Sequence, residues 1–485
     1  MSVDVLKRTP LRRVRPALAV TAGKVAGRAS VMAGRGGGTS LPGLVAQRIA
    51  PDIAATLAAD LPRGSLVVAG TNGKTTTAAM LAAALTAQGL RPVHNRAGAN
   101  LLRGVASALL AEAGPHGRLR VGRDAIGLFE ADEAALPAIV RAVRPSAVVV
   151  TNLFRDQLDR YGELDVIGLR WRAAFRDLPP DAALVLNADD PLVASLGDDA
   201  ERRVVYYGLD LPTGRFERPP ESADSISCRR CGALLDYDKV YYGHLGVYRC
   251  ANCGWARLRP ALSGVSVAAR GLDGSRLRVR IDGAGSEGDA DLEFDLRVPG
   301  LYNAYNALAA LAGAHAIGLD AARTARALEG VHAAFGRAER LELDGRSVWL
   351  LLIKNPTGCD EVLRLLSDIA APLDLLAVLN DNAADGQDVS WIWDTALEDL
   401  TPSLRHVTYA GTRAEDMALR FKYAGHDETA EGATAIVRDP LAALDAAMAA
   451  APSEQPLYVL ATYTAMLELR RGLVTRGVIR HYLSR

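Results

Sequence analysis

The residues with the clearest chemical meaning lie in a glycine-rich stretch, 70–77, which reads Gly-Thr-Asn-Gly-Lys-Thr-Thr-Thr. It follows an apolar run at 66–69 and precedes an Ala/Leu-rich run at 78–85, so the pattern predicts a strand, a loop and a helix. Backbone N–H groups in such a loop bind phosphate, and the helix N-terminus adds partial positive charge. Lys74 can reach the β- and γ-phosphates of a nucleotide, and the Thr75 hydroxyl can hold Mg²⁺. The alternative is a plain strand-to-helix turn.

Polar side chains also follow three other apolar runs, at 125–129, 147–150 and 183–186. Alanine-rich helical stretches separate these runs, which predicts an α/β fold with a parallel sheet covered on both faces. Such sheets bind ligands at the carboxyl ends of their strands, and Mg²⁺ prefers a few carboxylates there. A single acid at a strand end would instead cap a helix. The acids and amides at these ends are Glu130, Asp132, Glu133, Asn152, Asp156, Asn187, Asp189 and Asp190.

Four of the five cysteines form the pattern C-x2-C-x18-C-x2-C, which is typical of a structural zinc site. Four thiolates close the zinc tetrahedrally and leave no position for chemistry, so we predict a stabilising zinc ribbon at about 222–258. An interaction surface is the alternative. The expected ligands are Cys228, Cys231, Cys250 and Cys253, and Tyr237, Tyr241, Tyr242 and Tyr248 would fill the ribbon's core.

The second half of the chain holds two further polar groups. Residues 262–298 alternate apolar and polar side chains, which predicts antiparallel strands. Asn303 and Asn306 then share a helix face and can read an adenine edge, unless one caps the helix. After a turn near 344–345, strands and helices alternate again, and residues 379–394 combine many acids with two tryptophans. We interpret that run as a site; the alternative is a turn before an amphipathic helix.

Composition limits the class of protein. The chain has 485 residues, 49% of them apolar, with 56 Lys and Arg against 56 Asp and Glu, which argues against a general nucleic-acid binder. No apolar run reaches the roughly 18–20 residues that span a bilayer. There is no signal peptide, and paired cysteines favour metal in a reducing compartment, so we expect a cytoplasmic protein. The expected domains are 1–62 (helices and a glycine-rich loop), 63–340 and 341–485.

Residues 1–35 carry eight Lys or Arg side chains against one acid, Asp4, with apolar residues interleaved. This pattern fits a basic amphipathic helix on the inner, anionic face of a membrane. It also fits an N-terminal helix docked on the protein core.

Taken in order, the motifs resemble those of the Mur ligase family. The resemblance covers most of residues 66–340 and implies an ATP-dependent ligase, in which a carboxylate attacks the γ-phosphate and an amine then displaces phosphate from the acyl phosphate. It rests on residues 70–76, Glu130, Thr151, Asn152, Asp156, residues 187–191, Gly300, Asn303, Asn306, Gly336, Arg337 and Glu339.

The resemblance implies roles for these residues. Thr75 and Glu130 would hold Mg²⁺, and Lys74 and Glu130 would act in catalysis. Many members use a carbamylated lysine at a second Mg²⁺, but residues 155–186 contain no lysine, so the number of Mg²⁺ ions stays open. The implied ATP-binding residues are Gly70, Thr71, Asn72, Gly73, Lys74, Thr75, Thr76, Asn303, Asn306 and Arg337.

Within the family, the chain is most similar to ligase-like subunits that amidate lipid II in peptidoglycan synthesis. Four features carry this: the ribbon insertion, residues 354–358, residues 385–394, and the short N-terminal part where relatives bind a UDP-sugar. The substrate would be the α-carboxylate of D-glutamate in the stem peptide.

The ammonia would come from a separate glutaminase chain, GatD, docked on the C-terminal domain. The remaining cysteine, Cys359, has no nucleophile motif around it and is expected to be a buried apolar residue. Asp388 or Asp385 would orient the partner's Cys–His pair, and the sequence does not choose between them. Substrate or partner contacts are expected at Asn152, Asp156, Lys354 and Asn355.

Two other functions fit parts of the pattern. One is a Mur-like ligase that adds an amino acid to a UDP-linked or poly-γ-glutamyl acceptor without a glutaminase. The other is a nucleotide-binding zinc-ribbon scaffold without catalytic activity.

Overall fold

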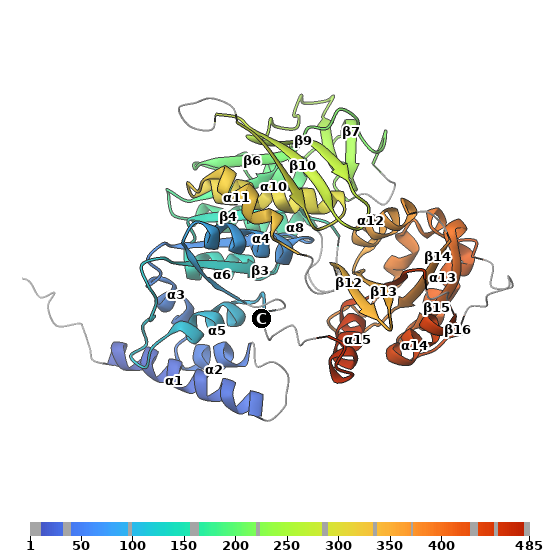
Figure 1. Cartoon of the computed structure of the whole chain (residues 1–485). Coiled ribbons are helices and arrows are strands. Elements are labelled where there is room, and N and C mark those ends of the chain that lie inside the picture. The colour runs from blue at the N-terminus through green and yellow to red at the C-terminus, as the bar shows by residue number, and fades with distance from the viewer. Residues whose placement is uncertain are drawn as a thin grey trace, which may run out of the picture.

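The structure is a computed structural model that describes residues 11–32, 40–95, 99–155, 164–219, 224–283, 290–332, 337–369, 372–426, 435–450 and 454–479. Two sheets, each covered by helices, lie side by side, and a small hairpin projects from the first (Figure 1). The α/β prediction is therefore confirmed.

Nine strands form the larger sheet, in the order β11-β10-β9-β6-β5-β4-β1-β3-β2. Neighbours from β2 to β9 are parallel, and β10 and β11 continue the sheet antiparallel. The parallel strands β1, β3, β4 and β5 are buried along their whole length, whereas β10 alternates because one face meets solvent. The strands are β1 (Ser65–Ala69), β2 (Arg91–His94), β3 (Ala125–Ala131), β4 (Ala147–Val150), β5 (Ala183–Asn187), β6 (Val204–Leu209), β9 (Leu262–Ala269), β10 (Ser275–Ile281) and β11 (Ala290–Leu296).

Helices cover both faces of this sheet. One core contains Leu66 and Val68 of β1 and lies under α4 (Lys74–Ala87), α10 (Leu301–Ala316) and α11 (Ala321–Glu329). The opposite core contains Val67 and Ala69, the alternate residues of the same strand. It lies under α5 (Leu102–Glu112), α6 (Leu136–Val143), α8 (Leu164–Arg176) and α9 (Pro191–Ser195).

Three N-terminal helices extend the second core: α1 (Leu11–Met32), α2 (Leu41–Ile49) and α3 (Ile53–Ala58). Ala19 and Val20 of α1 are buried there, and Lys24 donates a hydrogen bond to the Ala113 carbonyl at 2.6 Å. The helix is therefore docked on the core. Its outward side carries large apolar residues, all more than half exposed: Val14, Leu18, Val25 and Met32.

These four residues form one stripe of α1, because a rotation of about 100° per residue places them within roughly 40° of one another. We call them the outer α1 stripe. Ala19 and Val20 lie on the opposite side, so α1 has two apolar faces. In Figure 1, α1 forms the lower edge of the molecule. Among the described residues, none of the helices has the length and apolar character needed to cross a bilayer.

The second sheet has six strands in the order β12-β13-β17-β14-β15-β16, parallel except for β12. The strands are β12 (Arg337–Leu343), β13 (Arg346–Leu352), β14 (Leu373–Val378), β15 (Leu404–Ala410), β16 (Ala435–Ile436) and β17 (Leu457–Ala461). One face packs on α12 (Pro356–Ser367), α13 (Ala414–Tyr423) and the short 3₁₀ helices η2 (Ser390–Asp394) and η3 (Leu397–Asp399). The other face packs on α14 (Pro440–Ala450) and α15 (Tyr463–Thr475). A third 3₁₀ helix, η4 (Thr401–Ser403), leads into β15. The sheet begins within a few residues of the boundary expected near 340.

The predicted ribbon region lies between β6 and β9 and contains the hairpin of β7 (Asp236–Tyr242) and β8 (Leu245–Arg249). Tyr237 and Tyr248 pack with its cysteines, as expected. Tyr241 and Tyr242 instead join the core of the large sheet, because the end of the hairpin leans onto the central domain. For these two residues the expectation of a ribbon core was wrong.

Candidate active site

The predicted phosphate loop joins β1 to α4, and its glycines are required by close contacts. Gly73 has φ +85°, and a Cβ there would lie 1.9 Å from Asn306 Oδ1. Gly70 has φ +135°, and a Cβ there would lie 2.1 Å from the Thr151 hydroxyl. Asn152 fastens the loop, since its Oδ1 accepts from the Asn72 N–H at 2.9 Å and its Nδ2 donates to the Asn72 carbonyl at 3.1 Å.

Lys74 points back over its own loop. Its ammonium donates to the carbonyls of Gly70 at 2.5 Å and Thr71 at 3.1 Å, and pairs with Glu133 at 3.2 Å. Both side chains of the ion pair are buried. Because a buried charge needs a counter-charge, Glu133 can hold Lys74 in place when no phosphate is bound.

Thr75 and Glu130 meet as the Mg²⁺ prediction requires. The Thr75 hydroxyl donates to Glu130 Oε2 at 2.9 Å. The other oxygen, Oε1, is buried and makes no hydrogen bond with the described part of the chain, and His94 Nε2 lies 3.6 Å from it. The Thr75 hydroxyl and this carboxylate oxygen are two neighbouring oxygen ligands, and oxygen ligands are what a hard cation such as Mg²⁺ prefers.

A cavity beside the loop is lined by both halves of the chain. The central domain contributes Asn72 and Gly73, and the C-terminal domain contributes Lys354 and Asn355. Asn355 Nδ2 donates to Asn72 Oδ1 at 3.1 Å, while Asn355 Oδ1 caps α12 by accepting from the Gly358 N–H at 2.8 Å. The remaining lining residues are Thr76, Asn152, Tyr242, Tyr302, Tyr305, Asn306, Leu352, Gly358 and Val362.

The two predicted adenine-reading amides occupy different places. Asn306 lines the cavity and accepts from the Thr77 hydroxyl at 3.4 Å. Asn303 lies behind it, because its Nδ2 donates to the Pro299 carbonyl at 2.6 Å and its Oδ1 accepts from Asn306 at 3.0 Å. Asn303 therefore orients Asn306.

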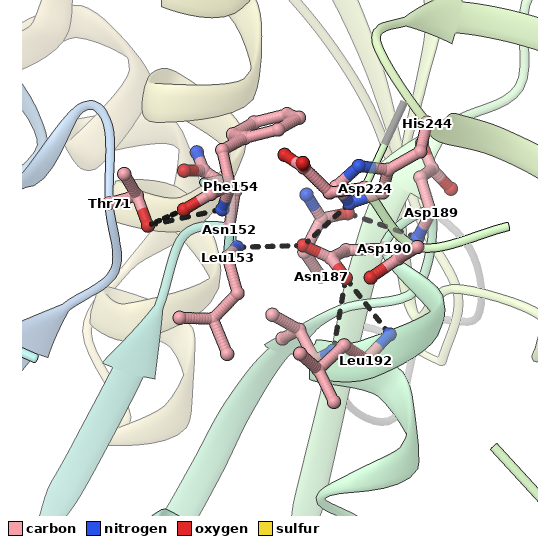
Figure 2. A network of polar contacts seen from close by, with 12 residues as sticks. Thr71, Asn152, Leu153, Phe154, Asn187, Asp189, Asp190, Leu192, Asp224 and His244 are labelled. Carbon is pink, nitrogen blue, oxygen red and sulfur yellow. Dashed lines mark hydrogen bonds and ion pairs between the residues drawn. The ribbon is translucent and has the colours of Figure 1, made fainter. Parts of the chain in front are cut away.

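Asp189 and Asp190 do not join the Mg²⁺ group expected at the strand ends. Asp190 caps α9 and accepts from the Leu153 N–H at 2.8 Å (Figure 2). Asp189 binds Arg257 at 2.6 Å and the Tyr305 hydroxyl at 2.7 Å, and its burial raises its pKa. These acids hold the ribbon region and helices to the sheet, so the helix-cap alternative applies to Asp190.

The four paired cysteines come together. Their sulfurs lie within 4.8 Å of one another, with 3.6 Å between Cys228 and Cys253 and 3.5 Å between Cys231 and Cys250. Sulfurs around a tetrahedral zinc with bonds of about 2.3 Å are about 3.8 Å apart, so the cluster fits that ion.

The C-terminal acids differ in environment. Asp385 is buried and accepts from the Thr464 N–H at 2.7 Å, and also from the Thr464 hydroxyl. Asp388 is exposed and accepts from the Ser390 N–H at 2.8 Å, and hydrogen bonds from Ser390 lower its pKa. Cys359 is buried, which raises the pKa of its thiol well above the usual range, as expected of an apolar residue.

Some predicted residues cannot be placed. Asp156 and Gly336 lie outside the described residues, as does the Arg337 side chain. Conversely, sequence reasoning gave no site role to His94 or Tyr242, and it expected Glu133 among the acids near Mg²⁺ rather than as the ion-pair partner of Lys74. A histidine directly after the short run Arg91–Val93 was the available signal for His94, and Glu133 stands three residues after Glu130.

Family models and solved structures of known proteins identify the fold. Residues 68–219 match the Mur ligase middle domain, and residues 352–466 match the MurT ligase C-terminal domain. Among solved structures, a pseudomurein peptide ligase type C from Methanothermus fervidus has a TM-score of 0.64 at 22% identity, covering 85% of this chain and 79% of that one. A peptide ligase from Acinetobacter baumannii has a TM-score of 0.61 at 16% identity, covering 90% and 80%. The fold is that of the Mur ligases.

Curated relatives show which group of Mur ligases the chain belongs to. The chain is 34% identical over 470 residues to the MurT subunit of lipid II isoglutaminyl synthase (glutamine-hydrolyzing) from Streptococcus pneumoniae, covering 96% of this chain and all of that one. It is also 34% identical to the Staphylococcus aureus MurT subunit, covering 84% and 87%. The chain belongs to the MurT family of Mur ligases.

Proposed function

We propose that this chain is the ligase subunit of an enzyme that amidates the D-glutamate α-carboxylate of the lipid II stem peptide. ATP would activate the carboxylate as an acyl phosphate, and ammonia from a GatD-like glutaminase would displace the phosphate. The observation that carries the proposal is the cavity in which the phosphate loop, Asn306 and the MurT-type C-terminal residues Lys354 and Asn355 meet.

Different residues of the chain would have different roles in phosphoryl transfer. Lys74 would exchange Glu133 for the γ-phosphate, while the loop N–H groups hold the phosphates. Thr75 and Glu130 would hold Mg²⁺, which supplies positive charge to the β- and γ-phosphates. Asn306, oriented by Asn303, would contact the nucleotide from its place beside Gly73 of the loop. No side chain becomes covalent in this scheme.

The partner surface is proposed on the C-terminal domain around Asp388. Asp388 hydrogen-bonds the first residue of η2, which carries Trp393. Trp393 is 47% exposed and packs edge-on against the 70% exposed Tyr423, with ring centroids 5.6 Å apart. Exposed aromatic pairs beside a fixed charge are typical of interface anchors.

We also propose that the outer α1 stripe rests on the membrane that contains lipid II. The stripe is apolar, faces away from the core, and has the exposed Arg15 and Arg28 on the same helix. Packing on the core requires only one apolar face of α1. A second, exposed apolar face is what a helix that lies on a membrane surface requires.

The function is tested by measuring lipid II amidation with ATP, using glutamine or ammonium chloride, with and without a co-purified glutaminase. We expect glutamine to require the partner and high ammonium to replace it. ATP hydrolysis without amide formation under either condition would rule out the substrate, and free amino acids would then be tested with UDP-linked acceptors.

A further inference from the structure

The end of the β7–β8 hairpin reaches the nucleotide cavity. Tyr242 is fully buried, lines the cavity with Asn72, and packs edge-on against Phe154 with ring centroids 5.1 Å apart. A Cβ on Gly243 would lie 2.9 Å from the Phe154 ring and 3.2 Å from the Thr357 side chain. The hairpin end is therefore wedged between the central domain and α12.

His244, the next residue, is fully buried and lies against the segment behind the phosphate loop. Its Nε2 is 3.4 Å from Asp190 Oδ2, and its ring centroid is 4.6 Å from that of Phe154 (Figure 2). Neither ring nitrogen makes a hydrogen bond with the residues that the structure describes. Burying an imidazole with so few polar partners costs free energy of folding, which makes a purely packing role for His244 unfavourable.

From Asp190 the contacts continue to the loop. Asp190 accepts from the Leu153 N–H, and the next residue, Phe154, forms two hydrogen bonds with the Thr71 hydroxyl. That hydroxyl donates to the Phe154 carbonyl at 3.0 Å and accepts from the Phe154 N–H at 3.1 Å. The conformation of Thr71 is thus tied to the position of His244.

In the other direction, His244 is tied to the cysteine cluster. The Tyr237 hydroxyl donates to the His244 carbonyl at 3.0 Å, and its ring lies 6.0 Å from that of Tyr248. Tyr248 packs with Trp255 and the ligand residues Cys228 and Cys250 in the core of the ribbon. If zinc holds the cysteines in place, the packed core of the ribbon holds the Tyr237 ring. The hydrogen bond from Tyr237 then holds the His244 backbone at the hairpin end.

We propose that the zinc ribbon is a positioning element of the ATP site, in which His244 transmits the order imposed by the zinc to the phosphate loop. The proposal rests on the ATP-dependent function proposed above. Without the zinc or the His244 side chain, ATP affinity should fall roughly tenfold, a typical coupling between two sites. The kcat at saturating ATP should change less than about twofold, because no reacting atom is touched.

The test compares His244→Ala, His244→Asn and a matched ribbon control, Leu234→Ala, whose side chain is 70% exposed. ATP affinity is measured by calorimetry on the full chain, together with zinc content, melting temperature, and KM and kcat for ATP in the amidation assay. We expect H244A to bind ATP more weakly while it retains zinc, and H244N to recover part of the ATP affinity. L234A should have the ATP affinity of the wild type. The wild-type chain stripped of zinc should bind ATP as weakly as H244A.

Wild-type ATP affinity in H244A or in the folded, zinc-stripped chain overturns the proposal. If H244A does not fold, Tyr237→Phe removes the same link from the ribbon side and keeps the ring; unchanged ATP affinity there also overturns it. A wild-type chain that binds no ATP would instead reject the proposed function itself.

Discussion

Asp385 and Asp388 stand three residues apart in the sequence, yet only one of them is free to meet another protein. Asp385 is used inside the domain, where it accepts two hydrogen bonds from Thr464. Asp388 is exposed, and hydrogen bonds from Ser390 lower its pKa and so favour its charged form. A carboxylate that orients a histidine in a neighbouring chain needs that exposure and charge, so Asp388 is the better candidate.

We predict that Asp388→Asn lowers glutamine-dependent amidation about 10²-fold or more, as expected when a residue that orients a catalytic base is lost. Amidation from ammonium chloride should stay within about twofold of wild type, because the ligase cavity is unchanged. The two assays are run on the same complex, with Asp368→Asn, an exposed acid outside the proposed partner surface, as control. Equal losses in both assays would contradict a role confined to the glutaminase reaction.

At the scale of elements, the turn from β1 into α4 allows a test of steric fit. Gly73 and Gly89 stand at opposite ends of α4 with similar φ angles, +85° and +79°. A Cβ at Gly73 meets Asn306, whereas one at Gly89 meets nothing within 4 Å. Gly89→Ala should therefore lower stability by about 1 kcal/mol and leave ATP binding intact. Gly73→Ala should weaken ATP binding at least tenfold, measured by calorimetry; equal affinities for the two variants would contradict the close fit.

The contact of α12 with η3 predicts a pH effect. Asp360 accepts from the Ala396 N–H at 2.8 Å, and burial raises its pKa from 3.8 to about 6. Because the folded state binds this proton more tightly than the unfolded state, the contribution to stability is full below about pH 4 and is lost as the pH rises through about 6. Asp360→Asn keeps the acceptor and should gain roughly 2–4 °C in melting temperature over wild type at pH 7.

This gain should vanish near pH 4, and thermal unfolding of both proteins across that range measures it. Asp368→Asn, an exposed acid at the other end of α12, should show no such trend. A gain for D360N that does not change with pH would mean that the buried carboxyl does not titrate in this window.

The elements themselves were predictable where burial leaves a simple pattern. β4 is a continuous apolar run because helices cover both its faces, and β10 alternates because one face meets solvent. The edge strand β2 was not predicted, since four residues including an arginine, a proline and a histidine carry no such pattern. The pairings of Lys74 with Glu133 and of Asp190 with Leu153 join segments far apart in the chain, which no local pattern encodes.

At the scale of the whole molecule, α1 connects the core to its surroundings. One side packs on the central domain through Ala19 and Val20, and the other presents the outer α1 stripe. Apolar area of this kind on a protein surface is normally covered by a partner. The sequence left docking and membrane contact as alternatives, and the structure shows that docking uses only one side.

We predict that the double variant Leu18→Gln and Val25→Gln binds vesicles of anionic phospholipid at least about tenfold more weakly than the wild type, because two apolar side chains no longer enter the interface. Cosedimentation at low and high salt measures this, with Leu419→Gln as a control for an exposed leucine elsewhere. ATP hydrolysis should be unaffected. Vesicle binding that both proteins share, or that neither shows, would contradict the membrane role of the stripe.

Asn355 begins α12 in one domain and touches Asn72 in the other, so a nucleotide in their shared cavity would brace the two halves of the chain against each other. The proposed glutaminase sits on the braced half. When ATP is scarce, the two halves would keep only their direct contacts, such as that of Asn355 with Asn72, and the partner would be held less firmly in the working orientation. A shortage of ATP would then lower glutamine hydrolysis by the partner together with amide formation.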